Sequence, residues 1–382
     1  MPNIFDYIPE VILLATTLIC SLFLIKKPLN NKDIKVLNAL FIIGLCLCAS
    51  SIIQETITLQ QILIKNIFKI YFLLAATYHL FTYSKKFHAL ERLCLVTTCI
   101  GLFITVSTTD SFMLLLAFSL CIVSTYGFAI TRERPTKDTA TLTSLLLIIG
   151  ILYGLHPFMA SMVLLIIIIL FCLRTTNKDI EALCITLLVP AGIYLLLREL
   201  LASQDPSQIE LTLITVGFIL MLSPTILLFA GTNKTKNMAK FAIFYIGTIL
   251  FLMGSGTPDI KAAAIVMTLS LVFIYSPIIN PLTIIGLSML PPTTAFVMKV
   301  PLFWAPFKNA ELVQIILVSV TTLVMTIFAA KELYLFHTSK KGTFIPFPIP
   351  FKFISIAVII ISVIYFSYIN QTLEYAIKAL GR

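Results

Sequence analysis

Long apolar runs alternate with short charged or Pro/Asn-rich breaks along nearly the whole chain. A helix needs about 20 apolar residues to cross the hydrocarbon layer of a membrane, and its backbone polar groups are then paired within the helix. The pattern therefore predicts fourteen membrane-spanning helices. Their approximate ranges are 8–25, 36–54, 66–84, 93–109, 111–131, 139–155, 157–173, 182–200, 208–230, 239–256, 262–279, 281–303, 311–330 and 352–370.

The composition agrees with a membrane environment. Of the 382 residues, 59% are apolar and 12% are charged, whereas soluble domains have about 45–50% and about 25%. This excludes a soluble enzyme, a disordered chain, a collagen, a coiled coil and a nucleic-acid binder. The predicted fold class is an all-α polytopic membrane protein that forms a single transmembrane domain, and the longest polar connection is expected around 331–351.

The basic residues predict the orientation of the chain. Taken alternately, one set of predicted loops holds 19 of the 27 lysines and arginines, whereas the other set, together with both termini, holds six. Basic loops stay on the cytoplasmic side, so both termini are expected on the outer side. The outer set comprises Lys65, Arg198, Lys261, Lys308, Lys378 and Arg382, while Lys240 and Lys331 belong to the cytoplasmic set.

Motifs of catalysis and metal binding are missing from the sequence. It has no Gly-rich phosphate loop, no HExxH and no plausible nucleophile elbow. The eight cysteines form no CxxC, no histidine lies near them in sequence, and the four histidines are scattered. We therefore expect no metal site, no bound cofactor and no redox centre in this chain.

Two lysines fall inside predicted spans, where an ionisable group is expensive and often functional. Lys69 lies near the end of its span, so its four-carbon stem is expected to reach the headgroups. Lys299 lies far from any other charge, since its nearest charged neighbours are Lys261 and Lys308. A buried lysine can switch between its charged and neutral forms and so pass on a proton.

The segment before Lys299 is expected to break its helix. It contains two prolines followed by two threonines: Pro291, Pro292, Thr293 and Thr294. Prolines remove backbone hydrogen bonds and free carbonyl groups, and transporters use such discontinuous helices to build ion sites at mid-depth. A second interpretation stays open: Lys299 could be paired to a carbonyl or lie near the surface, because Trp304, which suits the membrane interface, is five residues away.

The stretch from Leu290 to Lys299 resembles the IPPTAGFxGK sequence of the antiporter-like membrane subunits of respiratory complex I. The resemblance is strongest to subunit N of bacterial NADH:quinone oxidoreductase, which is mitochondrial NADH dehydrogenase subunit 2. In that family the lysine is a proton-channel residue, a role that Lys299 would inherit. The family fold has two inverted five-helix repeats with discontinuous helices.

Three further stretches resemble the same family in the same order. Residues 101–130 match GMxLMASSNDLLTLFLGLELxSLPLYxLAA, residues 232–247 match TNIKRLLAYSSIxHxG, and residues 191–198 match the end of the first broken helix. Coinciding residues include Gly101, Asp110, Lys236, Ala239 and Gly247. The resemblance implies three N-terminal helices (8–92), a first repeat (93–200), a second repeat (208–330) and a C-terminal helix (352–370).

The sequence departs from the family where proton chemistry is expected. The family's essential glutamate falls on Ser119, the lysine of its first broken helix falls on Val189, and the lysine of its NIK motif falls on Thr235, which Lys234 and Lys236 flank. Serine does not ionise near pH 7, so Ser119 cannot replace a carboxylate. The first half-channel should therefore be lost, and the second should keep Lys299.

The resemblance thus implies a diverged subunit N-like scaffold with at most one residual proton half-channel. Its partners would be the lipid bilayer and membrane subunits of the L, M, K, A and J types, and the whole complex would use NADH and quinone. The membrane would be the bacterial inner membrane or, alternatively, the mitochondrial inner membrane.

Two other functions stay open from the sequence. One is a free-standing cation/proton antiporter of the same fold, which needs ionisable groups at two depths. The other is an integral-membrane transferase or flippase, which usually has acidic or histidine residues at a membrane face; the outer loops carry few of these, although Asp205 and Glu210 lie together in one of them. We interpret that pair as solvated loop residues.

Overall fold

The structure is a computed structural model, and almost all of its described residues are helical. It describes residues 15, 43–44, 64–82, 89–108, 110, 113–114, 116–117, 120–121, 123–125, 127, 156–174, 178–203, 205–229, 237–255, 258–275, 281–290, 302 and 312–338. The chain divides into two compact units, Met1–Leu196 and Leu197–Arg382. Each unit is described by itself.

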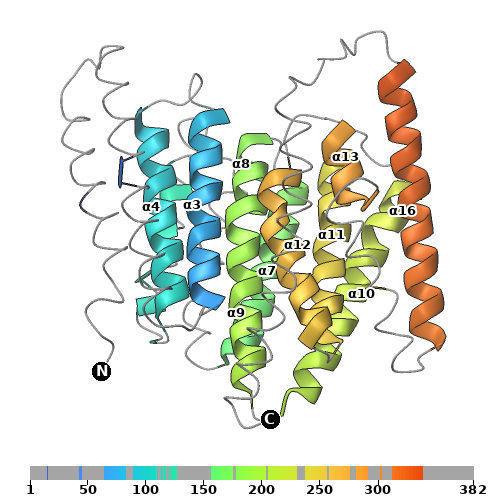
Figure 1. Ribbon diagram of the computed structural model, residues 1–382, viewed down its shortest axis with the longest axis horizontal. Coiled ribbons are helices and arrows are strands. Elements are labelled where there is room, and N and C mark those ends of the chain that lie inside the picture. The colour runs from blue at the N-terminus through green and yellow to red at the C-terminus, as the bar shows by residue number, and fades with distance from the viewer. Residues whose placement is uncertain are drawn as a thin grey trace. The chain divides into compact units, whose positions relative to one another are not determined.

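Unit 1 contains α3 (Ile64–Thr82), α4 (Ala89–Ser107), α7 (Pro157–Arg174), α8 (Lys178–Leu183), a π-helical turn η2 (Cys184–Leu188) and the first part of α9 (Val189–Ala202). Helices α3 and α4 lie side by side, and α8, η2 and α9 form one continuous helix (Figure 1). That helix contacts α3 and α7 through η2.

Unit 2 contains α10 (Ser207–Phe229), α11 (Asn237–Gly254), α12 (Pro258–Ile274), α13 (Pro281–Leu287) and α16 (Leu312–Thr338). Every residue of α11 from Met238 to Gly254 is buried. Its neighbours are α10, α12 and α13, and α16 packs against α10 and α13. Helix α11 is therefore the central helix of this unit.

Helices α10 and α11 approach each other closely at glycines. A Cβ atom added to Gly247 would lie 2.7 Å from the Met221 nitrogen and 2.8 Å from the Gly217 oxygen. A Cβ atom on Gly217 would lie 2.5 Å from the Phe251 nitrogen. Small residues allow this backbone contact, which is a common basis of helix association in membranes. Gly247 is one of the residues that carry the family resemblance.

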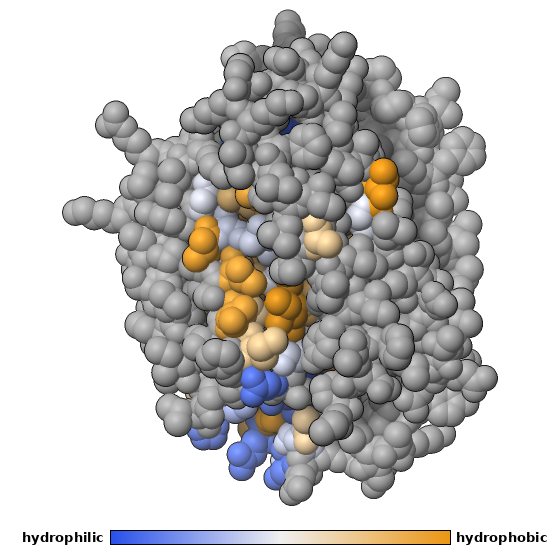
Figure 2. Space-filling model, turned by 90° about the vertical axis from the view of Figure 1, so that its left-hand side faces the viewer, coloured by the Kyte–Doolittle hydropathy of each residue, from blue (hydrophilic) through white to orange (hydrophobic). Residues whose placement is uncertain are grey.

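Four described helices are long and apolar enough to cross a membrane: Asp179–Ala202, Ser207–Phe229, Asn237–Gly254 and Gln314–Leu335. Exposed side chains on α16 are mainly apolar, with Leu323 and Ile327 each 60% exposed. On the face that Figure 2 draws, described apolar side chains form a strip, and hydrophilic ones gather at one end of it. Such surfaces suit a hydrocarbon solvent, so the chain is a membrane protein.

Several predicted spans coincide with observed helices, and two differ. Helix α16 continues to Thr338, eight residues past the predicted end at 330, into the region predicted as a polar connection. A helix pairs its backbone N–H and C=O groups internally, so it can extend beyond the apolar layer of the membrane. The helix that begins at Pro281, in the predicted span 281–303, already ends at Leu287.

The end of α13 is a well-formed helix cap. The Leu290 N–H donates to the Ile285 oxygen over 2.8 Å, and the Met289 N–H donates to the Gly286 oxygen over 3.1 Å. Met289 has a positive φ of 55°, a conformation that this cap normally gives to glycine. The chain therefore leaves the helix immediately before residues 291 and 292.

The predicted spans 8–25, 36–54, 139–155 and 352–370 lie outside the described residues apart from residues 15, 43 and 44, which are helical. The helix count of fourteen and the two inverted repeats therefore stay predictions.

Candidate functional site

Most site residues predicted from the sequence lie outside the described residues. These are Lys299, Pro291, Pro292, Thr293, Thr294, Lys234, Lys236, Ser119 and Thr235. Val189 is described: it begins α9 and is fully buried. Its apolar side chain sits directly after the π-helical turn, where the resemblance places a lysine.

The π-helical turn has a cause in the sequence. Pro190 has no N–H, so it cannot donate to the carbonyl of Thr186 four residues earlier, and its ring crowds that carbonyl. The backbone widens there, and the Val189 N–H donates to the Cys184 oxygen five residues back. The hydroxyl of Tyr71 on α3 donates to the Thr186 oxygen over 2.7 Å and satisfies the carbonyl that Pro190 cannot reach.

A second α3 side chain binds the same threonine. The Thr186 hydroxyl donates to the Ala182 oxygen over 2.7 Å, and a hydroxyl has a single proton to donate. The hydroxyl oxygen of Thr186 therefore accepts a hydrogen bond from Nε2 of the buried His79, 2.7 Å away. Tyr71 thus binds the backbone carbonyl of Thr186, and His79 binds its side-chain hydroxyl. π-Helical turns often occur at functional sites.

Lys69 lies inside unit 1 and not at the lipid surface. Its exposed fraction is 0%, which places it among the largest fully buried side chains of the described residues. The prediction that its stem reaches the headgroups is therefore wrong. Like Lys299, Lys69 is a charged residue within an apolar run, but its position near a span end favours an interpretation in which the amine reaches the membrane surface.

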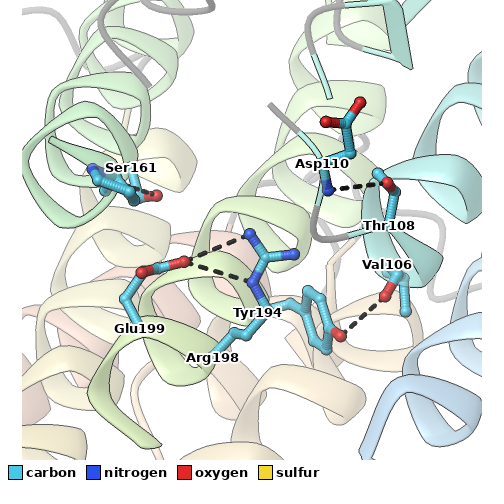
Figure 3. A network of polar contacts seen from close by, with 8 residues as sticks. Val106, Thr108, Asp110, Ser161, Tyr194, Arg198 and Glu199 are labelled. Carbon is cyan, nitrogen blue, oxygen red and sulfur yellow. Dashed lines mark hydrogen bonds and ion pairs between the residues drawn. The ribbon is translucent and has the colours of Figure 1, made fainter. Parts of the chain in front are cut away.

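Helix α3 also contacts α9 beyond the π-helical turn. The rings of Phe68 and Tyr194 lie 5.0 Å apart between centroids. The Tyr194 hydroxyl donates to the Val106 oxygen over 2.9 Å, at the end of α4 (Figure 3). Carbonyls in the last turn of a helix have no partner within the helix. Tyr194 therefore ties α9 to the end of α4.

Unit 2 has a buried lysine in the first turn of α11. Lys240 is counted with the cytoplasmic set of basic residues and lies at the start of the predicted span 239–256; in the structure it is part of the helix and only 4% exposed. Its Nζ donates to the Leu227 oxygen over 3.4 Å and to Oδ1 of Asn237 over 3.3 Å. Nδ2 of Asn237 donates to Oε1 of Glu332 over 2.8 Å. The amide presents its acceptor to the amine and its donor to the carboxylate.

An ion pair lies toward the other end of α10. Lys261, in the first turn of α12, donates to Oε1 of Glu210 over 2.8 Å. Asp205 does not pair with Glu210; its Oδ1 accepts from the backbone N–H and hydroxyl of Ser207 at the start of α10. The interpretation of Asp205 and Glu210 as a solvated loop pair is therefore wrong for Glu210.

The middle of α11 holds a buried tyrosine, Tyr245. The Tyr245 hydroxyl is 2.7 Å from the Ser270 hydroxyl and 3.2 Å from the Met267 oxygen. This contact joins the middle of α11 to α12. In the family that the sequence resembles, many members have histidine at this position.

Two residues that carry the resemblance have structural roles. Oδ2 of Asp110 accepts from the Met113 N–H and so caps the helical residues that follow (Asp110 is shown in Figure 3). A Cβ atom on Gly101 would lie 2.5 Å from Cys121 Sγ and 2.8 Å from the Ala117 oxygen. The shared pattern therefore reflects capping and helix packing at these positions.

Within the part of the chain that the structure describes, no group of three or more histidine, cysteine, aspartate or glutamate residues could hold a metal ion.

No protein-family model and no curated protein matches the chain. Solved structures do. A chain of the Mrp complex from Dietzia sp. DQ12-45-1b matches with a TM-score of 0.65 and 12% identity over 86% of this chain and 79% of that chain.

Two respiratory complexes match more of the chain. A chain of respiratory complex I from Thermus thermophilus with bound aureothin has a TM-score of 0.65 and 15% identity, covering 95% of this chain and 97% of that chain. A chain of the membrane-bound sulfane sulfur reductase, an archaeal respiratory membrane complex, has a TM-score of 0.66 and 15% identity, covering 97% of both chains. This chain therefore shares the fold of membrane chains in these complexes.

Proposed function

We propose that this chain is a membrane subunit of a multisubunit energy-converting complex, as a diverged relative of subunit N in a proton-translocating NADH:quinone oxidoreductase. The observation that carries the proposal is the shared fold over 95% of this chain and 97% of a chain of Thermus complex I. The collinear sequence resemblance supports it independently. Fold alone does not define a function, so the site residues and the partners decide the finer role.

In this proposal the chain is mainly a scaffold for other membrane subunits. NADH and quinone react elsewhere in the complex, and this chain binds neither. Lys299 is the candidate proton-channel residue, with the break at Pro291 and Pro292 and the hydroxyls of Thr293 and Thr294 beside it in sequence. The membrane is proposed to be the bacterial inner membrane, with both termini outside.

A free-standing cation/proton antiporter is the second candidate. It needs ionisable groups at two depths, and unit 2 offers them in described residues: Lys240 with Asn237 and Glu332 toward one end, and the Glu210–Lys261 pair toward the other.

Blue-native electrophoresis of solubilised membranes separates the two candidates. A tagged chain that migrates in a large particle with NADH dehydrogenase activity supports the respiratory subunit. A small particle that contains this chain alone contradicts the subunit proposal and favours the antiporter.

A further inference from the structure

Helix α16 carries a buried hydroxyl group that has no hydrogen-bond partner within the described part of the chain. Thr322 is only 5% exposed, and its Oγ1 atom makes no hydrogen bond there. The neighbouring Thr321 is also buried, but its hydroxyl donates to the Leu317 oxygen of the same helix over 2.9 Å. Buried polar groups are nearly always hydrogen-bonded, so the exception at Thr322 requires an explanation.

The Thr322 side chain lies on the flank of α16 that faces α13. Helix α16 packs against α10 and α13 (Figure 1), and Phe328 marks the side toward α10, because its ring lies 5.2 Å from that of Phe229. Successive residues of a helix are about 100° apart, so Thr322 lies about 120° around α16 from Phe328. Leu323, which lies a further 100° or so around the helix, is 60% exposed. The buried flank away from α10 is therefore the one toward α13.

The end of α13 lies at a similar depth in the membrane. The predicted spans place Pro281, at the start of α13, and Lys331 at the same membrane surface. Thr322 precedes Lys331 by as many residues as Leu290 follows Pro281, which corresponds to a helical rise of about 13 Å. This depth is near the middle of a hydrocarbon layer that is about 30 Å thick. The Thr322 hydroxyl and the cap of α13 therefore have corresponding positions on two helices in contact.

The cap of α13 provides hydrogen-bond acceptors at that depth. The Ile285 and Gly286 oxygens are used within the cap, whereas the next two carbonyl groups, of Leu287 and Ser288, accept no hydrogen bond from another described residue. Both residues are buried. The Ser288 hydroxyl donates to the Ile284 oxygen, so its own oxygen can also accept. A hydroxyl without a partner on α16 thus faces carbonyl groups at the end of α13.

We propose that Thr322 binds a buried water molecule that joins α16 to the end of α13. The Thr322 hydroxyl donates to the water oxygen, and the water donates its two protons to the Leu287 and Ser288 oxygens. The water then has three hydrogen bonds, which is typical of buried water in proteins. This inference does not rest on the proposed function, because the water depends only on the packing of α13 and α16 within unit 2.

Hydroxyl-radical footprinting with X-rays tests the proposal, because radicals that form from a buried water label the side chains next to it. Met325 is fully buried one turn after Thr322 on the same face of α16, and the equally buried Met221 on α10 is the reference. In the full chain in lipid nanodiscs, we expect Met325 to be labelled several-fold faster than Met221. Thr322→Val should abolish the difference, whereas the matched control Thr321→Val should preserve it. Equal labelling of the two methionines before any substitution would overturn the proposal.

The thermal stability of the same variants provides a second test. Valine has nearly the shape of threonine but no hydroxyl. If the site were dry, Thr322→Val would remove an unsatisfied buried group and raise the unfolding temperature. If the hydroxyl binds water, the substitution removes a hydrogen bond from the bridge, so we expect the unfolding temperature to fall. A rise would contradict the bound water. Neither measurement uses NADH dehydrogenase activity, so failure of the proposed function would leave both results interpretable.

Discussion

Pro190 lies within the continuous helix from Lys178 to Ala202, where it can donate no backbone hydrogen bond. The consequence reaches another helix, because the Thr186 carbonyl oxygen accepts a hydrogen bond from the Tyr71 hydroxyl on α3. An unsatisfied buried carbonyl costs about 1–3 kcal/mol. At the residue scale, one missing N–H therefore fixes the role of a distant tyrosine.

Tyr71→Phe should destabilise the chain by about 1–3 kcal/mol, because it leaves the Thr186 carbonyl unsatisfied. Combined with Pro190→Ala, which restores an N–H four residues after Thr186, the same change should cost less. Thermal unfolding in detergent measures both. Tyr334→Phe, at an exposed tyrosine on α16, is the control and should have little effect. An equal cost of Tyr71→Phe in both backgrounds would show that Pro190 is not the cause.

Lys299→Ala tests the proton-channel residue that the sequence resemblance predicts. NADH-driven proton uptake and quinone reduction are measured together in membranes that contain the complex. We expect fewer protons taken up per quinone reduced, because the amine that gains and loses a proton is removed. Unchanged coupling would exclude Lys299 from the mechanism and leave the subunit assignment intact.

The contact of α10 with α11 depends on backbone approach at Gly217 and Gly247, and it builds the interior of unit 2 around a fully buried helix. The packing of α10, α11, α12 and α16 then brings polar groups from different helices together: Lys240 with the Leu227 oxygen, Asn237 with Glu332, and Glu210 with Lys261. At the scale of elements, helix packing therefore decides which charged groups meet.

Gly247→Ala should destabilise the chain by about 1–3 kcal/mol, because the added methyl group meets backbone atoms of α10 that cannot move independently. Gly192→Ala is the matched control, since its nearest contact is a Leu165 side-chain methyl at 3.3 Å that can shift. Unfolding by heat or by sodium dodecyl sulfate gives the comparison. Equal effects of the two changes would mean that the glycine contact does not hold α10 and α11 together.

At the scale of the whole molecule, the distribution of basic residues predicts the orientation of the chain in the membrane. The 19-to-6 division of basic residues predicts that both termini are on the outer side. In bacterial cells, alkaline phosphatase fused to the C-terminus should therefore be active, and green fluorescent protein fused there should not fluoresce. Fusions within 331–338 should behave in the opposite way. A fluorescent C-terminal fusion would contradict this orientation.

The similarity to solved structures extends over nearly the whole chain, whereas the sequence resemblance consists of short stretches. Asp110 caps a helix, and Gly101 and Gly247 permit close packing. Such residues can be shared by chains that differ in proton chemistry, which explains how a recognisable pattern coexists with Val189 in place of a lysine. Of the predicted site residues, only Val189 is described, and it is buried as an apolar residue should be.

The sequence by itself determined that this protein lies in a membrane, and it determined most of the described helices. The reason is that the length of an apolar run is a local property, and these runs match the thickness of a membrane. Only the tertiary structure decided which charges are inside. Burial of Lys69, the pairing of Glu210 with Lys261 and the two α3 partners of Thr186 depend on segments far apart in the chain. A position near the end of an apolar run does not reveal whether lipid headgroups or protein atoms surround the side chain, because packing with other helices sets that environment.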